Sequence, residues 1–318
     1  MTDNIIFCAN AVFPLIVLIF LGMFIKTRQK LFANPKDFFY HVEKLVFNVA
    51  LPVFIFNEIA QAEPGAIFNP ALVIYCVAGI LILCVLLVLI TGVIIKDKSV
   101  RGAFIQGSFR SNFAILGVPL AGNLFGAVGS ATAALVLPFV IVLYNSLAVI
   151  ILTLNSGHPQ NNNFKKIIMG IIKNPLIIAI FIALPFLIFD ISKPEIIQRS
   201  LNYISNMSTP LALISLGAGV DLQLLRAKIK LSLTASLVKT AISPAVFTIP
   251  AIMLGFRNEA LTVIFVLFAA PTAVSSYIMA KNMHSDADLA GQILALTTVI
   301  CPVTIFAGSF ILKSINLI

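Results

Sequence analysis

The chain has 318 residues, of which 60% are apolar and only 10% are charged. An average soluble domain is about 45–50% apolar and about 25% charged, and a water-soluble fold of this length could not hide the excess apolar surface. The composition therefore excludes a soluble enzyme, a soluble nucleic-acid-binding protein and a disulfide-stabilised secreted protein. It predicts an all-α polytopic membrane protein.

Apolar runs separated by short polar breaks predict ten membrane-spanning helices, because about 20 consecutive apolar residues are needed to cross a bilayer. We expect the first to be a retained helix rather than a cleaved signal peptide, since Asp3 precedes it and its basic residues follow it. The predicted spans cover residues 5–25, 38–58, 70–95, 102–122, 129–154, 167–189, 196–219, 230–254, 258–280 and 288–312.

The net charge of +9 reflects membrane topology rather than nucleic-acid binding, because the basic residues cluster between the apolar runs. The even-numbered connections carry only Lys193, Arg199 and Arg257. The odd-numbered connections carry Lys26, Arg28, Lys30, Lys36, Lys96, Lys98, Arg101, Lys165, Lys166, Lys173, Arg226, Lys228, Lys230 and Lys281. Since excess Lys and Arg face the cytoplasm, we expect both termini on the non-cytoplasmic side of the plasma (inner) membrane.

Five predicted spans on each side of the chain's midpoint suggest two repeats, 1–155 and 167–318, joined by a central cytoplasmic loop, 156–166. An odd number of spans per repeat would insert the second repeat upside down. Leu51-Pro52 and Thr209-Pro210 are predicted to interrupt spans 2 and 7. Gly117-Val118-Pro119 and Pro271 are predicted to interrupt spans 4 and 9. Matching interruptions in inverted repeats indicate a secondary transporter's binding site, although membrane helices also tolerate proline without any such role.

Two stretches resemble signatures of the auxin efflux carrier family: Ser111–Leu120 (SNFAILGVPL), followed by Leu124-Phe125-Gly126, and Ala270–Ala280 (APTAVSSYIMA). The short central loop is similar to that of bacterial malate- and malonate-permease-like members rather than plant ones. The resemblance implies broken helices 4 and 9 that cross each other, and a scaffold of spans 1, 2, 6 and 7. It also implies elevator-like transport of organic monoanions or dicarboxylates.

The interrupted helices supply the candidate substrate-binding residues, because a half-helix N-terminus at membrane depth offers free N–H groups and partial positive charge to a carboxylate. Asn112 lies about two turns before Pro119, and the resemblance implies a substrate contact there; an interhelical bridge is the alternative. The full set of candidates is Asn112, Gly117, Val118, Pro119, Pro271, Ser275, Ser276, Lys239 and Asn57. The two serines would contact substrate or satisfy carbonyls freed by Pro271, and Asn57 would line an entrance.

Two basic residues within the predicted spans have different expected roles. Lys239 must face a partner inside the protein, because a lysine at bilayer depth is costly. It would either neutralise the negative ends of the broken helices or contact substrate. Arg110 is expected to face away from Asn112, because two residues of helix rotate the chain by about 200°.

These patterns predict a secondary transporter of a small organic anion with alternating access. The candidates are a monocarboxylate, a dicarboxylate and an auxin-like anion. No metal or cofactor is expected, since the sequence has no clustered histidines or paired carboxylates at depth. This argues against an intramembrane enzyme, and the absence of an output domain argues against a sensor. An unrelated ten-helix drug or metabolite exporter is the main alternative. Membrane lipid is the other expected partner, nucleic acid is not, and a homodimer stays open.

Overall fold

The computed structural model describes residues 2–28, 34–61, 69–155, 169, 173–220 and 228–318, and this part of the chain is helical without strands. Within these described ranges, seven helical segments are long and apolar enough to cross a membrane, as expected of a multi-pass membrane protein. The predicted loop 156–166 lies outside the described residues. The ten-span count and the inverted repeat stay predictions.

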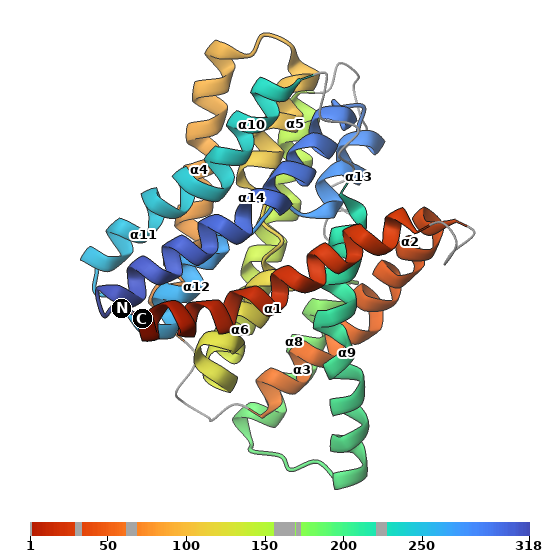
Figure 1. Ribbon diagram of the computed structural model, residues 1–318, viewed down its shortest axis with the longest axis vertical. Helices are drawn as coiled ribbons and strands as arrows, with labels where there is room; N and C mark the ends of the chain where they lie inside the picture. The colour runs from red at the N-terminus through yellow and green to blue at the C-terminus, as the bar shows by residue number, and fades with distance from the viewer. Residues whose placement is uncertain (1, 29–33, 62–68, 156–168, 170–172, 221–227) are drawn as a thin grey trace.

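Most helical residues lie in the apolar runs of the sequence, although several helices begin or end in the polar breaks (Figure 1). In chain order they are α1 (Thr2–Thr27), α2 (Pro35–Leu45), η1 (Val46–Ala50), α3 (Leu51–Ala60), α4 (Pro70–Ile94), α5 (Lys98–Phe109), η2 (Phe113–Gly117), α6 (Val118–Leu154), α8 (Pro175–Ile188), α9 (Glu195–Gly219), α10 (Ile229–Leu237), η4 (Val238–Ile242), α11 (Ser243–Met253), α12 (Asn258–Ala269), α13 (Val274–Asn282) and α14 (Ala287–Ser314).

The segments η1, η2 and η4 are single turns of π-helix, and each is followed directly by a helix with proline as its second residue. These prolines are Pro52, Pro119 and Pro244. Proline has no N–H group, and its ring clashes with the carbonyl four residues earlier. In all three cases that carbonyl belongs to the central residue of the π turn, so the wider turn relieves the clash and the helix continues.

Three predicted interruptions are wrong in detail. The helix continues through Leu51-Pro52, because α3 follows the π turn η1 directly. Helix α9 runs without a break through Pro210, as membrane helices permit when other groups satisfy the freed backbone. The interruption expected at Gly117-Val118-Pro119 lies earlier, at Arg110–Asn112, while residues 113–119 are helical. In contrast, Pro271 lies in a true gap between α12 and α13, as predicted.

Long helix α6 contains a sharp bend that separates the predicted fourth and fifth spans. Gly126 has φ +61° and ψ −147°, and Phe125 is also non-helical. A side chain at Gly126 would be strained by this positive φ even though no atom crowds the position. The bend lets the chain reverse without a polar loop.

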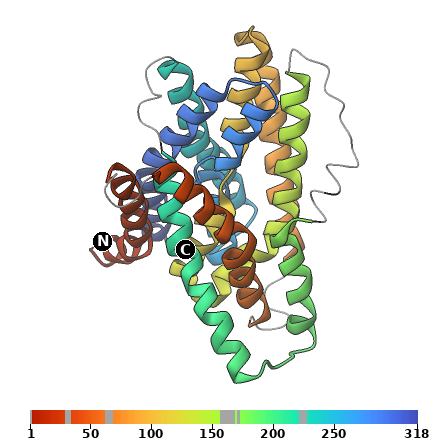
Figure 2. The same ribbon diagram turned by 90° about the vertical axis from the view of Figure 1, so that its right-hand side faces the viewer.

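The helices pack as two groups (Figures 1 and 2). The α9 group contains α1, α2, η1, α3, α8 and α9, with α1 and α3 both packed on α9. The α14 group contains α4–α6 and α10–α14. Glycines allow α1 and α9 to touch: a Cβ on Gly22 would lie 2.0 Å from the Ile214 oxygen, and one on Gly217 would lie 1.9 Å from the Ile19 oxygen.

Residues of the basic connections gather at one end of the molecule. Lys26 Nζ donates to the Val220 oxygen at 2.7 Å, and Arg101 Nε donates to Asn155 Oδ1 at 2.6 Å. The Ser285 hydroxyl donates to the Ser99 oxygen at 2.7 Å. Lys228 forms an ion pair with Asp286. These contacts link described residues of all five odd-numbered connections. The connections that are rich in Lys and Arg therefore lie together at one end of the fold.

Candidate substrate-binding site

The two gaps in the helices meet inside the protein. The chain is non-helical at Arg110–Asn112 between α5 and η2, and again at Ala270–Ala273 between α12 and α13. The backbone N–H of Asn112 donates to the Pro271 oxygen at 2.7 Å. This bond joins positions far apart in the sequence and brings four helix ends to one place.

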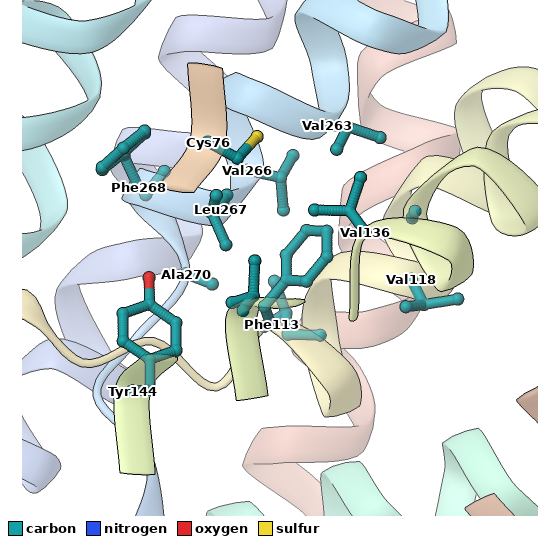
Figure 3. Packing of buried hydrophobic residues seen from close by; sticks show 14 of the residues in the cluster. Cys76, Phe113, Val118, Val136, Tyr144, Val263, Val266, Leu267, Phe268 and Ala270 are labelled. Carbon is teal, nitrogen blue, oxygen red and sulfur yellow. The ribbon is translucent and has the colours of Figure 1, made fainter. Parts of the chain in front are cut away.

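Tight packing holds this meeting point in position. Figure 3 shows Phe113, the first residue of η2, among side chains of α4, α6 and α12. The neighbours include Cys76, Val136, Val263 and Leu267. A Cβ on Gly117 would lie 2.2 Å from the Phe113 ring. Gly117 therefore serves packing, because only hydrogen at this position leaves room for the ring.

Lys239 stabilises one of the four helix ends. Its side chain is 0% exposed, and Nζ donates to the oxygens of Phe268 at 2.7 Å and Leu267 at 3.3 Å. Both carbonyls belong to the last turn of α12, where the helix dipole is negative and carbonyls lack helical partners. Of the two roles expected for Lys239, the contacts therefore favour neutralisation of a broken helix end.

A cavity of about 190 Å³ lies beside the meeting point, between the two helix groups. One part of its lining is polar and the other part is mainly apolar. The polar side chains are Arg110, Ser111, Asn112, Asn145, Asn174 and Ser275. The other lining residues are Phe47, Phe113, Ala114, Leu137, Val140, Ile141, Tyr144, Leu176 and Ala273. No acidic side chain is among the described residues that line the cavity.

Arg110 faces this cavity, contrary to expectation. It is 6% exposed, and Nη2 donates to Asn145 Oδ1 at 2.7 Å and to Ser275 Oγ at 2.8 Å. Its Nη1 lies 2.9 Å from Met279 Sδ. The helical rotation assumed for Arg110 does not apply, because its backbone is extended (φ −70°, ψ 137°) after the last residue of α5. All of these partners are neutral, so none of them balances the positive charge of the guanidinium.

Asn112 lies within the gap itself, rather than two turns away on a continuous helix. Its side chain is 7% exposed, and Nδ2 has no hydrogen-bond partner in the described structure. The hydroxyl of neighbouring Ser111 is likewise without a well-formed hydrogen bond there. A buried donor without a partner costs about 1–3 kcal/mol, and such atoms at a cavity wall are suited to a polar ligand.

The remaining predicted site residues do not line the cavity. Val118 and Pro119 are buried within the start of α6. Ser276 is 1% exposed and lies 3.4 Å from the Thr272 hydroxyl.

Asn57 lies in a separate polar network between α3 and α9. Its Nδ2 donates to Asn202 Oδ1 at 2.7 Å, and its Oδ1 accepts from Gln198 Nε2 at 2.8 Å. Gln198 Nε2 is also 2.8 Å from Asn202 Oδ1. Because both ends of the Asn57 amide are occupied, this residue connects two helices of the α9 group.

Of the polar lining residues, sequence reasoning missed Arg110, Ser111, Asn145 and Asn174. Asn145 carried a signal, since an amide in the middle of an apolar span generally faces protein or a polar cavity. Asn174 precedes Pro175 and caps α8, with Oδ1 accepting from Leu176 N at 2.9 Å. That capping pattern explains the residue locally and gives no indication of the cavity.

Comparison with known proteins supports a transport role for this arrangement. The model of a family described as membrane transport protein matches residues 7–307. An uncharacterized transporter of Methanothermobacter thermautotrophicus is 22% identical over 311 residues, covering 95% of this chain and 98% of the relative. One from Methanocaldococcus jannaschii is 24% identical, with 91% and 94% covered.

Plant proteins match over a shorter region. Auxin efflux carrier component 7 of Arabidopsis thaliana is 30% identical over 138 residues, covering 40% of this chain and 22% of the plant protein. The family model, in contrast, covers nearly the whole chain. The chain therefore belongs to the membrane transport protein family, which includes the auxin efflux carriers and is a family of transporters, not of enzymes.

Proposed function

We propose that this protein is a secondary transporter that carries a small organic anion, with a carboxylate bound between Arg110 and Asn112. The observation that carries the proposal is the buried Arg110 guanidinium, whose described partners Asn145, Ser275 and Met279 are all neutral. A buried charge without a counter-charge is strongly unfavourable. An anionic ligand in the cavity would supply that counter-charge.

Asn112 would complete the recognition of the carboxylate. Its unpartnered Nδ2 can donate to one oxygen while Arg110 donates to the other, since guanidinium and amide donors both suit a planar carboxylate. The start of η2 adds backbone N–H groups at the same place. The cavity of about 190 Å³ favours a small substrate, because the pockets that hold drug-sized ligands measure about 300–1,000 Å³.

An alternating-access, elevator-like movement is supported by the position of the cavity between the helix groups. Phe47, Asn174 and Leu176 belong to the α9 group or its edge, whereas the other lining residues belong to the α14 group. A second cavity of about 560 Å³ is lined by Lys26, Glu43 and Lys281, among others, at the end where the basic connections gather. A small cavity of about 30 Å³ shares Glu43 with it and Phe47 with the binding cavity. A substrate entering from the expected cytoplasmic side would pass along these neighbouring cavities.

Counterflow in proteoliposomes tests the proposal. Purified protein is first screened for thermal stabilisation by mono- and dicarboxylates and by matched neutral amides, and the best acid is then used as radiolabelled substrate. We expect stabilisation by acids only. Arg110→Gln and Asn112→Ala should each reduce exchange at least tenfold, because each removes a contact to the anion.

Asn123→Ala is the matched control, because its Nδ2 donates to the Ala11 oxygen at 2.8 Å, away from the cavity. This variant should lose stability and retain exchange. Asn112→Ala should do the reverse, since its Nδ2 has no partner to lose. Full exchange by correctly folded Arg110→Gln, or equal stabilisation by the neutral amides, would contradict the proposed anion site.

A further inference from the structure

A groove separate from the transport cavity lies on the membrane-facing side of the α14 group. It has a volume of about 180 Å³ and is formed where the ends of α4, α5 and α6 meet. Figure 2 shows α4 and the C-terminal half of α6 running side by side. The groove is lined by Val88, Gly92, Arg101, Ile105, Ile151, Leu154 and Asn155. Its walls are thus mainly aliphatic, with one cation at the end.

The aliphatic part of the groove is exposed at the surface of the protein. Val88 is 39% exposed and Leu154 is 68% exposed, on helices that are otherwise apolar. Gly92 is also exposed, and a Cβ added there would meet no atom within 4 Å. The missing side chain therefore widens a channel between helices where an acyl chain can lie.

The polar end of the groove carries positive charge. Arg101 Nε donates to Asn155 Oδ1 at 2.6 Å, and this amide oxygen is the hydrogen-bond acceptor of the guanidinium among the described residues. Asn155 is itself 5% exposed and is fixed by donation to the Ile151 oxygen at 2.8 Å. Arg101 is therefore held by one nitrogen, which leaves its terminal amino groups for another acceptor.

The surroundings of Arg101 favour an anion. Lys96 and Lys98 are exposed on the same connection. The nearby carboxylate of Asp97 caps α5, accepting from Ser99 N at 2.9 Å and Val100 N at 3.3 Å. No ion pair joins Arg101 to an acid in the described part of the chain.

We propose that this groove binds an anionic phospholipid, with the headgroup phosphate on Arg101 and an acyl chain along Val88, Gly92 and Leu154. A basic pocket between membrane helices at the expected cytoplasmic face is a suitable site for an anionic headgroup. The apolar walls favour a lipid over free phosphate, because an acyl chain would cover them and a small hydrophilic ion would not. This proposal does not depend on the transported substrate.

The test compares phosphatidylglycerol with phosphatidylcholine of identical acyl chains, added to the detergent-purified full chain. Thermal unfolding measures the stabilisation, and native mass spectrometry counts retained lipids. We expect phosphatidylglycerol to raise Tm more than phosphatidylcholine does. Arg101→Gln should increase the half-maximal phosphatidylglycerol concentration about tenfold, the effect of losing one charge-assisted contact.

Two further variants separate the groove from general surface charge. Gly92→Leu fills the channel without disturbing described neighbours and should also abolish the preference for phosphatidylglycerol. Lys98→Gln makes the same charge change as Arg101→Gln at a residue that does not line the groove, and should reduce the preference much less than Arg101→Gln does. An unchanged preference in both Arg101→Gln and Gly92→Leu would overturn the proposal, as would equal stabilisation by inorganic phosphate.

Discussion

Replacement of Lys239 by methionine should destabilise the protein and impair its binding site. The lysine Nζ donates to two carbonyls at the end of α12, at 2.7 and 3.3 Å, in a fully buried environment. Methionine has similar length and fills space adaptably, but it has no donor. Each unsatisfied buried carbonyl costs about 1–3 kcal/mol, while removal of a buried charge offsets part of that loss. The expected net destabilisation is about 2–4 kcal/mol.

The effect should extend to transport, because the stabilised helix end leads directly into the gap at Ala270-Pro271. The Pro271 oxygen accepts from the Asn112 backbone at 2.7 Å. A looser end of α12 would therefore shift Asn112, and KM for the proposed anion should rise. Thermal unfolding in detergent and counterflow in proteoliposomes measure the two effects on the same preparation.

Thr240→Val is the matched control within the same π turn. Thr240 is also 0% exposed, and its hydroxyl donates to the Ser236 oxygen at 2.8 Å within its own helix. Loss of that bond should cost less than about 1 kcal/mol, because both atoms belong to one helix. If Lys239→Met had the Tm and KM of Thr240→Val, the carbonyls of α12 would not depend on the lysine, and our reasoning would be refuted.

Three other properties can be tested directly. Gly217→Ala should destabilise the contact of α1 with α9 and lower Tm, because its Cβ would lie 1.9 Å from a backbone oxygen. Gly219→Ala is the control and should have little effect on Tm, because its Cβ would meet no atom within 4 Å. Equal effects of the two variants on Tm would contradict the packing argument. On cells with an intact inner membrane, an impermeant maleimide should label Ser192→Cys and leave Lys98→Cys unlabelled, and the reverse pattern would invert the topology. Transport should be independent of sodium, since no acidic side chain lines the described cavity; concentrative uptake driven by a sodium gradient alone, at fixed voltage and pH, would reveal a cation site.

The sequence determined the class of fold and the regions that matter. Apolar runs of about 20 residues have one stable form in a bilayer, because only a helix or a closed barrel satisfies the backbone there. The distribution of Lys and Arg identified the connections that gather at one end. Pro271 marked a real gap, and the substrate contact predicted for Asn112 stays a prediction. These features depend on local chemistry, so a single sequence is sufficient to predict them.

Only the tertiary structure decided where the charged and polar side chains face. Helical geometry predicted that Arg110 and Asn112 point apart, but the chain leaves the helix between them and both line one cavity. The helix continues through Pro119 because a π turn precedes it, and α9 continues through Pro210 without a break. Asn57 has two amide partners on α9 that no local pattern could indicate. A proline constrains only its own turn, whereas the partner of a buried polar group is set by helices that pack from distant parts of the chain.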